Sequence, residues 1–303
     1  MKKINSEAHF LRRDPRFKLD EDLILPAETR VQINECLAKL RHHKTIYMDW
    51  NFGSVDPLGM GTVLNFYGPP GTGKTLAAEA LAGTLGLPFI SIGIAEIESK
   101  FMGETAKNIQ KAFAETTESG AVLFFDEADT LLGKRLSSVT QGVDNEVNSM
   151  RSTMLIELER FEGIAIFATN FAKNYDKAFR SRISYHVKFD LPDLEARRAL
   201  WGRMLVKEIP IEGERDAFID WCAELSEGFS GREIRTCMRL ALPKPLIQAG
   251  GSEAKLTLEH LKESIHQLKQ THADVGSSVI ENRSSTRDAS IAKRMLGINS
   301  EKE

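Results

Sequence analysis

The sequence predicts an α/β protein in which a parallel β-sheet lies between two layers of helices and a smaller helical domain follows. Two observations predict this class. Up to about residue 190, short apolar runs typical of buried strands alternate with stretches whose apolar residues recur at helical spacing. After Pro192, only helical patterns remain. Buried strands that alternate with amphipathic helices favour a parallel sheet covered on both faces, which is a three-layer αβα architecture.

Five segments are the expected strands of this parallel sheet. They are the short, mostly apolar runs 62–67, 88–92, 121–126, 163–168 and 185–189. Helices are expected between them, with 104–118 and 146–161 the clearest. The chain is therefore expected to divide into an N-terminal arm at 1–25, a large αβα domain at 26–190, a helical domain at 191–270 and a polar tail at 271–303.

The composition is that of a globular protein without a strong charge bias. Its 303 residues include 40 Lys and Arg against 43 Asp and Glu, so no general basic field is available for nucleic acid. The three cysteines, Cys36, Cys222 and Cys237, lack metal-binding spacing and are expected to be reduced and buried. The first residues do not have the pattern of a secretory signal, and no apolar run approaches the roughly 18 residues of a membrane span. We therefore expect a cytoplasmic protein with no membrane partner.

A phosphate-binding loop follows the first expected strand. Residues 68–75 read Gly-Pro-Pro-Gly-Thr-Gly-Lys-Thr, the pattern GxxxxGK[ST], and a helical run follows. The glycines let backbone N–H groups point at phosphate oxygens, and the helix N-terminus adds partial positive charge. Lys74 is expected to reach the β- and γ-phosphates, and Thr75 to place its hydroxyl on Mg²⁺. The expected nucleotide-binding residues are Pro69, Pro70, Gly71, Thr72, Gly73, Lys74, Thr75 and Leu76.

Two further strand ends carry the side chains that hydrolysis needs. The apolar strand 121–126 ends in Asp126-Glu127. Asp126 is expected to hold Mg²⁺, directly or through water, and Glu127 to orient and deprotonate the attacking water. Strand 163–168 is followed by Thr169-Asn170, and an uncharged amide at this edge can contact both the water and the γ-phosphate. These residues predict ATP hydrolysis at the carboxyl edge of the sheet.

As a set, these motifs resemble the AAA+ ATPases, and more narrowly the AAA proper clade. The resemblance covers about residues 26–270 and rests on segments 68–75, 124–129, 168–170 and 228–231. It implies the P-loop NTPase fold, a helical lid domain, and ATP with Mg²⁺ bound between lid and large domain. It also implies a ring of identical subunits, usually a hexamer, and makes Asn170 the sensor-1 residue.

The resemblance also implies that an arginine reaches the nucleotide of a neighbouring subunit. Aligned on residues 191–193, Arg182 matches the second of two family arginines, whereas Phe179 occupies the place of the first. We expect Arg182 to be the trans-acting arginine, and Arg180 to be its helper or a solvated surface residue. Arg232 lies in the first turn of a capped helix, where the helix dipole disfavours a cation unless an anion is near. It is expected to be a sensor-2 residue, with an exposed arginine as the alternative.

Residues 99–104 resemble the substrate-gripping pore loop of AAA unfoldases. The segment contains Lys100, Phe101, Met102 and Gly103. An exposed Phe-Met pair is costly unless it binds something, although Phe101 could instead pack into its own domain. The leading prediction is therefore a ring motor that remodels or unfolds a partner protein.

Two other function classes and one narrower resemblance remain open. A DNA-associated AAA+ loader or regulator would favour basic pore residues, and Lys100 and Lys107 are too few to argue for it. A nucleotide-gated scaffold would not need Glu127, Asn170 and Arg182. The compact layout and residues 228–232 also resemble the HORMA-remodelling ATPases of the pachytene-checkpoint type, which have bacterial relatives in antiphage defence. A HORMA-like protein, engaged directly or through an adaptor, is then an expected substrate.

Overall fold

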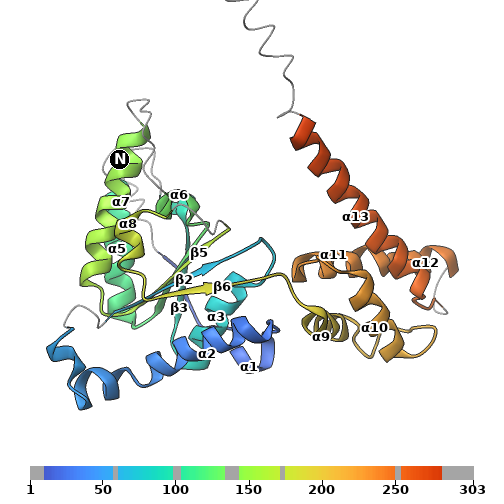
Figure 1. Ribbon diagram of the computed structural model, residues 1–303, viewed down its shortest axis with the longest axis horizontal. Coiled ribbons are helices and arrows are strands. Elements are labelled where there is room, and N and C mark those ends of the chain that lie inside the picture. The colour runs from blue at the N-terminus through green and yellow to red at the C-terminus, as the bar shows by residue number, and fades with distance from the viewer. Residues whose placement is uncertain are drawn as a thin grey trace, which may run out of the picture. The chain divides into compact units, whose positions relative to one another are not determined.

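The computed structural model describes residues 10–56, 61–97, 104–133, 143–170, 175–249 and 254–281. The expected pore loop, Lys100 to Gly103, lies outside these residues. The chain divides into two compact units, which are treated separately below (Figure 1). The first consists of Met1–Ala199 with Gly228–Arg232, and the second of Leu200–Glu227 with Glu233–Glu303.

The first unit is built on a six-stranded sheet with the order β1-β3-β4-β5-β2-β6. The strands are β1 (Arg12–Arg13), β2 (Thr62–Tyr67), β3 (Phe89–Gly93), β4 (Val122–Asp126), β5 (Ile164–Thr169) and β6 (Tyr185–Lys188). The five predicted strands are all present and pair parallel with one another. The predicted α/β class with a parallel core sheet is therefore confirmed.

The sixth strand, β1, was not expected from the sequence. It pairs antiparallel with β3, with Arg12 opposite Ile90 and Arg13 opposite Phe89. Two consecutive arginines are a poor local signal for a strand. Non-local contacts hold them in place instead: the Arg13 guanidinium lies 5.3 Å from the centre of the Phe89 ring and binds the carboxylate of Glu79.

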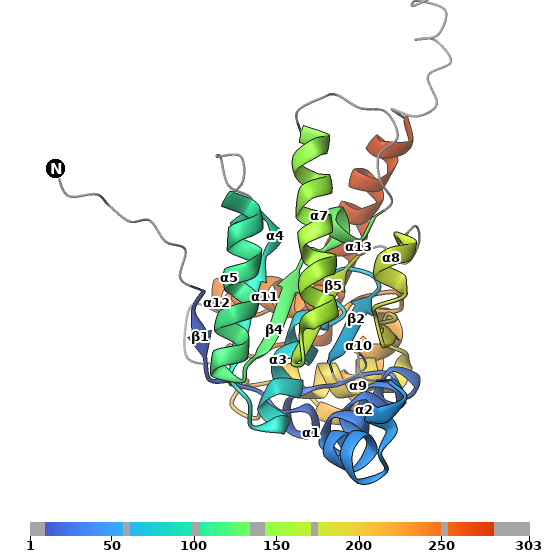
Figure 2. The ribbon, with the colours of Figure 1, turned by 90° about the vertical axis from the view of Figure 1, so that its left-hand side faces the viewer.

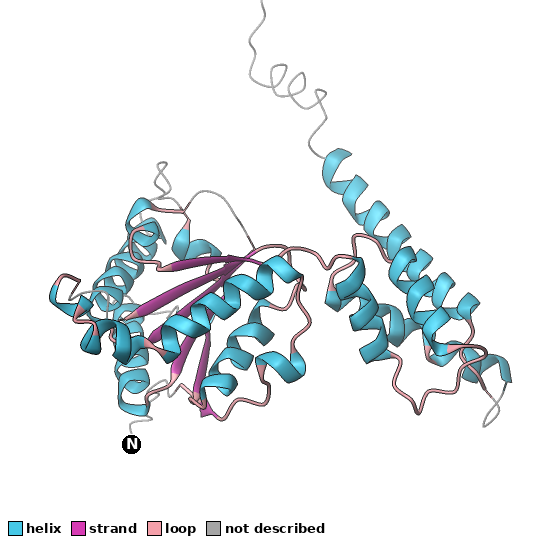
Figure 3. Ribbon diagram, turned by 60° about the horizontal axis from the view of Figure 1, so that its bottom comes forward, coloured by secondary structure: helices cyan, strands magenta, loops and turns pink. Residues whose placement is uncertain are grey.

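Helices cover both faces of this sheet (Figures 2 and 3). They are α1 (Leu19–Asp22), α2 (Ala27–Arg41), α3 (Lys74–Leu85), α4 (Ile94–Ile97), α5 (Glu104–Ser119), α6 (Asp129–Leu132), α7 (Val143–Arg160) and α8 (Lys177–Arg180), with a π-helical turn at Thr45–Asp49 and a 3₁₀ turn at Phe52–Ser54. Alternate residues of the interior strands β4 and β5 enter different cores. Leu123 and Phe125 of β4 pack with α5 and α7, whereas Val122 and Phe124 pack with α2 and α3. Strands buried on both faces explain their continuous apolar sequences.

The second unit is helical, as the sequence predicted. Its helices are the later part of α9 (Leu194–Met204), α10 (Arg215–Leu225), most of α11 (Gly231–Ala241), α12 (Pro243–Ala249) and α13 (Leu258–Glu281). Trp201 is fully buried in this unit, and its indole N–H donates to Ser226 Oγ at 2.9 Å. Helix α13 continues past residue 271, where a polar tail was expected. In the part of the chain that the structure describes, no helix is long and apolar enough to cross a membrane.

The cysteines are all reduced and buried, as expected. Burial raises the pKa of Cys36 to about 12, and the pKa of Cys222 and of Cys237 is raised to the same level for the same reason. A thiol with so high a pKa is a poor nucleophile. The three thiols are therefore part of the packing of the protein.

Candidate nucleotide-binding site

The phosphate-binding loop connects β2 to α3 and depends on its glycines. Gly68, Gly71 and Gly73 have φ angles of 146°, 78° and 98°, in the region that favours glycine. A Cβ atom on Gly68 would lie only 2.0 Å from the backbone oxygen of Phe189, so no other residue fits there without displacing the chain. Thr72 stabilises the turn, since its hydroxyl donates to Pro69 O at 2.8 Å.

Lys74 lies at the first position of α3 and is held by three oxygen atoms. Its ammonium donates to Gly68 O at 2.8 Å, Pro69 O at 2.8 Å and Asn170 Oδ1 at 3.0 Å. The residue is 8% exposed. Burial lowers the pKa of Lys74 to about 8, although the charges of Asp126 and Asp129 act in the opposite direction. The sequence predicted that Lys74 and Asn170 serve one site, and the structure brings them into contact.

Thr75 and Asp126 meet at the same edge of the sheet. The Thr75 hydroxyl donates to Asp126 Oδ2 at 3.1 Å. In the described ranges no cluster of three or more His, Cys, Asp or Glu residues could hold a metal by itself. Two hard oxygen ligands nevertheless fit Mg²⁺, which typically takes one or two protein oxygens and completes its shell with phosphate and water. The pair is therefore a suitable site for a Mg²⁺ ion that arrives with a nucleotide.

Glu127 has an unusual backbone conformation for a non-glycine residue. Its φ angle is 53°, and its N–H donates to Asp126 Oδ1 at 2.9 Å. A left-handed backbone is energetically costly for such a residue and is concentrated at functional sites. The next residue is fixed by a bond from Ala128 N to Ala168 O at 2.9 Å, while the Glu127 side chain is exposed. The strained turn thus presents a carboxylate beside Asp126.

Asp129 is a member of the site whose role the sequence reasoning missed. Its Oδ1 accepts hydrogen bonds from the Thr169 hydroxyl and, at 2.9 Å, from the Asn170 N–H. It therefore ties the first turn after β4 to the end of β5. The available signal was the spacing of the acidic residues at 126–129, because Asp129 follows Asp126 by three residues at the same strand end.

The structure places Arg232 close to the phosphate loop, within the first unit. Its backbone N–H donates to Gly71 O at 3.3 Å, and its charge is one of the influences that lower the Lys74 pKa. A Cβ on Gly71 would lie 2.8 Å from the Arg232 Cβ. The backbone of Arg232 thus lies beside the loop, while its role as a sensor-2 residue that contacts a phosphate stays a prediction.

The two candidate arginines of residues 179–182 differ in their surroundings. Arg182 donates to Ala178 O at 3.0 Å and to Glu159 Oε2 of α7 at 3.1 Å. Its Nε atom is buried and has no hydrogen-bond partner among the described residues. Arg180 is exposed at the end of α8. Both roles proposed for these arginines require a neighbouring subunit and stay predictions.

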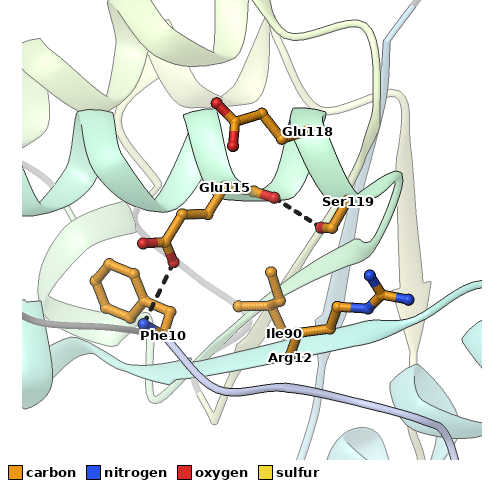
Figure 4. Close-up of a pocket in the computed structure, with 6 residues that line it drawn as sticks. All are labelled: Phe10, Arg12, Ile90, Glu115, Glu118 and Ser119. Atoms are coloured by element: carbon orange, nitrogen blue, oxygen red, sulfur yellow. Dashed lines mark hydrogen bonds between the residues drawn. The ribbon is translucent and has the colours of Figure 1, made fainter.

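A pocket of about 290 Å³ lies elsewhere on the first unit, beside β1 (Figure 4). The Phe10 N–H donates to Glu115 Oε2 at 3.3 Å across it. Its lining residues are Phe10, Arg12, Ile90, Glu115, Glu118 and Ser119. None of these is a predicted site residue, so the pocket is separate from the nucleotide site.

Comparison with known proteins identifies the family of this domain. Residues 64–191 match the family model "ATPase family associated with various cellular activities (AAA)". The chain is 34% identical over 178 residues to the 26S proteasome subunit RPT4 of Saccharomyces cerevisiae, covering 56% of this chain and 40% of that protein. It is 31% identical over 232 residues to the AAA domain-containing protein FIGL1 of Arabidopsis thaliana, covering 73% and 34%.

A bacterial relative extends the similarity along the chain. The ATP-dependent zinc metalloprotease FtsH 3 of Symbiobacterium thermophilum is 28% identical over 285 residues, which are 92% of this chain and 43% of that protein. The chain thus spans less than half the length of these curated relatives.

A solved structure has the same fold. The FIGL-1 AAA domain in complex with ADP superposes with a TM-score of 0.66 at 20% identity, covering 83% of this chain and 84% of that one. This likeness, the family model and the geometry of residues 68–75, 126–129 and 169–170 agree. The chain belongs to the AAA family of ATPases.

Proposed function

We propose that this protein is an ATPase that uses hydrolysis to remodel a partner protein. The observation that carries the proposal is the meeting of Lys74, Thr75, Asp126 and Asn170 at one edge of the sheet, with Glu127 beside them. The names of the similar proteins, among them an ATP-dependent metalloprotease and a proteasome subunit, support it.

In this proposal the loop at residues 68–75 binds the triphosphate of ATP. Lys74 is already desolvated and oriented by three acceptors, so it can transfer its hydrogen bonds to phosphate oxygens without a large rearrangement. Thr75 and Asp126 supply the oxygens that hold Mg²⁺. When bound, Mg²⁺ supplies charge neutralisation of the phosphate oxygens.

Glu127 acts as the general base in the proposed reaction. Its exposed carboxylate can accept a proton from the attacking water, and the hydrogen bond from its N–H to Asp126 fixes the turn that carries it. Asn170 can orient the same water, because its side-chain oxygen already lies 3.0 Å from the Lys74 ammonium. Asn170 thus positions the attacking water, and Glu127 accepts its proton.

We further propose that Arg182 acts on the nucleotide of a neighbouring subunit in a homo-oligomeric ring, with a hexamer as the expected size and Arg180 as its helper. An arginine that reaches the nucleotide of a neighbouring subunit increases kcat roughly 10³- to 10⁵-fold. Arg182→Ala should therefore abolish most activity. Mixing it with Lys74→Ala subunits should restore part of the activity, because these subunits retain Arg182. No recovery on mixing, with mixed rings confirmed by mass, would contradict trans action.

The proposed substrate is a polypeptide gripped by residues 100–103. The finer proposal is a HORMA-domain protein, reached directly or through an adaptor, in bacterial antiphage defence in the cytoplasm. It rests on the resemblance at Gly228–Arg232. Two alternative functions remain: a DNA-associated regulator and a nucleotide-gated scaffold. The experiment below distinguishes them from protein remodelling.

A trapping experiment tests the proposal. Glu127→Gln should bind ATP, fail to release phosphate and retain its substrate, so affinity capture should recover a specific protein. The matched control is Lys74→Ala, which should not bind ATP and should recover nothing. Recovery of nucleic acid without protein favours the DNA-associated function. Wild-type protein that binds ATP but releases no phosphate in a single turnover favours the scaffold.

A further inference from the structure

A buried polar side chain lies in the middle of the interior strand β2. Asn65 is 0% exposed, although its neighbours on the strand are apolar. Its Nδ2 donates to the Tyr175 hydroxyl at 3.1 Å and to His186 Nδ1 at 3.3 Å, while its Oδ1 has no partner among the described residues. An apolar residue at this position would avoid the cost of burying an amide. The network that Asn65 enters therefore needs an explanation.

The network runs in one direction, toward the nucleotide site. Because the Tyr175 hydroxyl accepts from Asn65, its own hydrogen remains available for Thr169, whose hydroxyl also interacts with it. The Thr169 hydroxyl in turn donates to Asp129 Oδ1. Since the Thr169 hydrogen is donated to Asp129 and the Tyr175 oxygen accepts from Asn65, we assign the hydrogen between the two hydroxyls to Tyr175. Ordered chains of this kind polarise and strengthen their members, and this one ends on a carboxylate.

The carboxylate at the end of the chain holds Asn170. Asp129 Oδ1 accepts the Asn170 N–H at 2.9 Å, and the Asn170 side chain contacts Lys74 at 3.0 Å. Tyr175 itself is fixed from the other side, since it forms a β-bridge with Gly133 and the next residue donates from Asp176 N to Leu132 O at 2.9 Å. The Tyr175 backbone is therefore anchored to the end of α6, and its hydroxyl is linked through Thr169 and Asp129 to the Asn170 backbone.

We propose that Tyr175 is a positioning residue for ATP hydrolysis. Through Thr169 and Asp129 its hydroxyl fixes the end of β5, and so fixes the Asn170 amide relative to the reacting water. This inference rests on the proposed role of Asn170. The bonds of Asn65 to Tyr175 and of Thr169 to Asp129 involve no residue of the phosphate-binding loop. We therefore expect Tyr175 to affect the rate of the chemical step more than the binding of ATP.

The substitution Tyr175→Phe tests this, because it removes one oxygen atom. We expect kcat to fall by about 3–10-fold, the range for one lost hydrogen bond, while KM for ATP changes less than about twofold. The matched control is Tyr185→Phe on the neighbouring strand β6, which should leave kcat unchanged. In an Asn170→Ala background, Tyr175→Phe should cause no further loss of kcat. An undiminished additional loss in that background would overturn the proposal.

A second pair of variants separates positioning from stability. Tyr175→Phe removes one of the two partners of the Asn65 Nδ2 group and leaves the His186 ring. Asn65→Leu combined with Tyr175→Phe instead replaces both members of the Asn65–Tyr175 pair by apolar groups, which is closer to neutral for stability. The combined variant should recover the melting temperature of the wild type but keep the low kcat. Recovery of kcat together with the melting temperature would show a purely structural role.

The two proposals fail in different ways. If Asn170→Ala leaves kcat unchanged, the role of Asn170 is wrong and Tyr175 has nothing to position. If Asn170→Ala lowers kcat while Tyr175→Phe behaves like Tyr185→Phe, only the inference about Tyr175 is wrong.

Discussion

The N-terminal arm is held to the phosphate-loop helix by a buried carboxylate, and removing its charge should destabilise the protein. Glu79 of α3 is 3% exposed. Its oxygens accept from Arg13 Nη2 at 3.0 Å, from Arg16 Nε at 3.0 Å and from the Arg16 backbone N–H at 3.1 Å. The substitution Glu79→Gln keeps the size of the side chain and removes the charge.

The expected loss of unfolding free energy in Glu79→Gln depends on how exposed Arg13 and Arg16 are. Breaking a buried ion pair costs about 3–5 kcal/mol when the remaining charge is stranded away from water. Here the Arg13 and Arg16 side chains are 42% and 65% exposed, so water solvates them after the change. What remains is the loss of charge-assisted hydrogen bonds to Glu79, a decrease of about 1–2 kcal/mol in the free energy of unfolding.

The stability lost in Glu79→Gln should be largest near neutral pH and should decrease in acid. Burial raises the pKa of Glu79, but hydrogen bonds from Arg16 and the charges of Arg13 and Arg16 outweigh burial and hold the pKa below its usual value. A carboxylate with a lowered folded-state pKa contributes its full stability above the unfolded-state pKa of about 4.3. This contribution begins to decrease below the unfolded-state pKa and disappears as the pH falls through the lower folded-state value, so the difference in stability between wild type and Glu79→Gln should shrink as the pH falls below about 4.3.

Urea denaturation at pH 7 and at pH 3.5 measures both effects. The matched control is Glu21→Gln, because Glu21 forms an exposed pair with Lys18, with side chains 66% and 60% exposed, and such pairs contribute little. Hydrogen exchange at Arg12 and Arg13 should accelerate in Glu79→Gln and stay slow in the control. Equal stabilities of the two variants at pH 7, or a loss that persists unchanged at pH 3.5, would refute the reasoning.

Three other predictions concern the site and the second unit. Gly68→Ala should abolish ATP binding, measured by calorimetry, because its Cβ would lie 2.0 Å from Phe189 O; unchanged affinity would contradict this. The pKa of Lys74 is about 8 in the free protein, and a bound phosphate favours the charged amine. ATP affinity should therefore fall as the pH rises above about 8. The control Lys74→Arg keeps its charge and should show no such fall between about pH 8 and 9.5. Ser226→Ala should lower the unfolding free energy by about 1–3 kcal/mol, because it leaves the buried Trp201 N–H without its acceptor; a melting temperature equal to that of wild type would refute this.

The sequence was informative where the signal is local. Four of the five parallel strands, β2 to β5, are short runs that are mostly apolar and largely buried, and the phosphate loop has a fixed spacing between its glycines and Lys74. The contact of Lys74 with Asn170 could be expected as well, because the carboxyl ends of parallel strands meet at one edge. Each of these features depends on a few consecutive residues or on a general property of parallel sheets.

Features that depend on distant residues could not be predicted in the same way. Strand β1 forms because Arg13 meets Glu79, which lies 66 residues away. The partnership of Asn65 with Tyr175 spans 110 residues. A polar residue in an apolar strand is visible in the sequence, but the identity of its partner is not. The bond between Asp129 and Asn170 joins residues 41 apart, and the sequence does not show which acidic side chain after β4 accepts it.

The arm also matters for how this domain is expressed or fused. Arg12 and Arg13 cover the backbone of β3, Leu19 N donates to Thr84 Oγ1 at 2.9 Å, and a Cβ on Gly83 would lie 2.1 Å from Phe17 O. A shortened protein that begins at Pro26 would lose these contacts and leave one edge of β3 unpaired. Unpaired edges recruit strands from other molecules. Such a truncation should therefore aggregate, and a fusion partner is better placed before Phe10 than between the arm and α2.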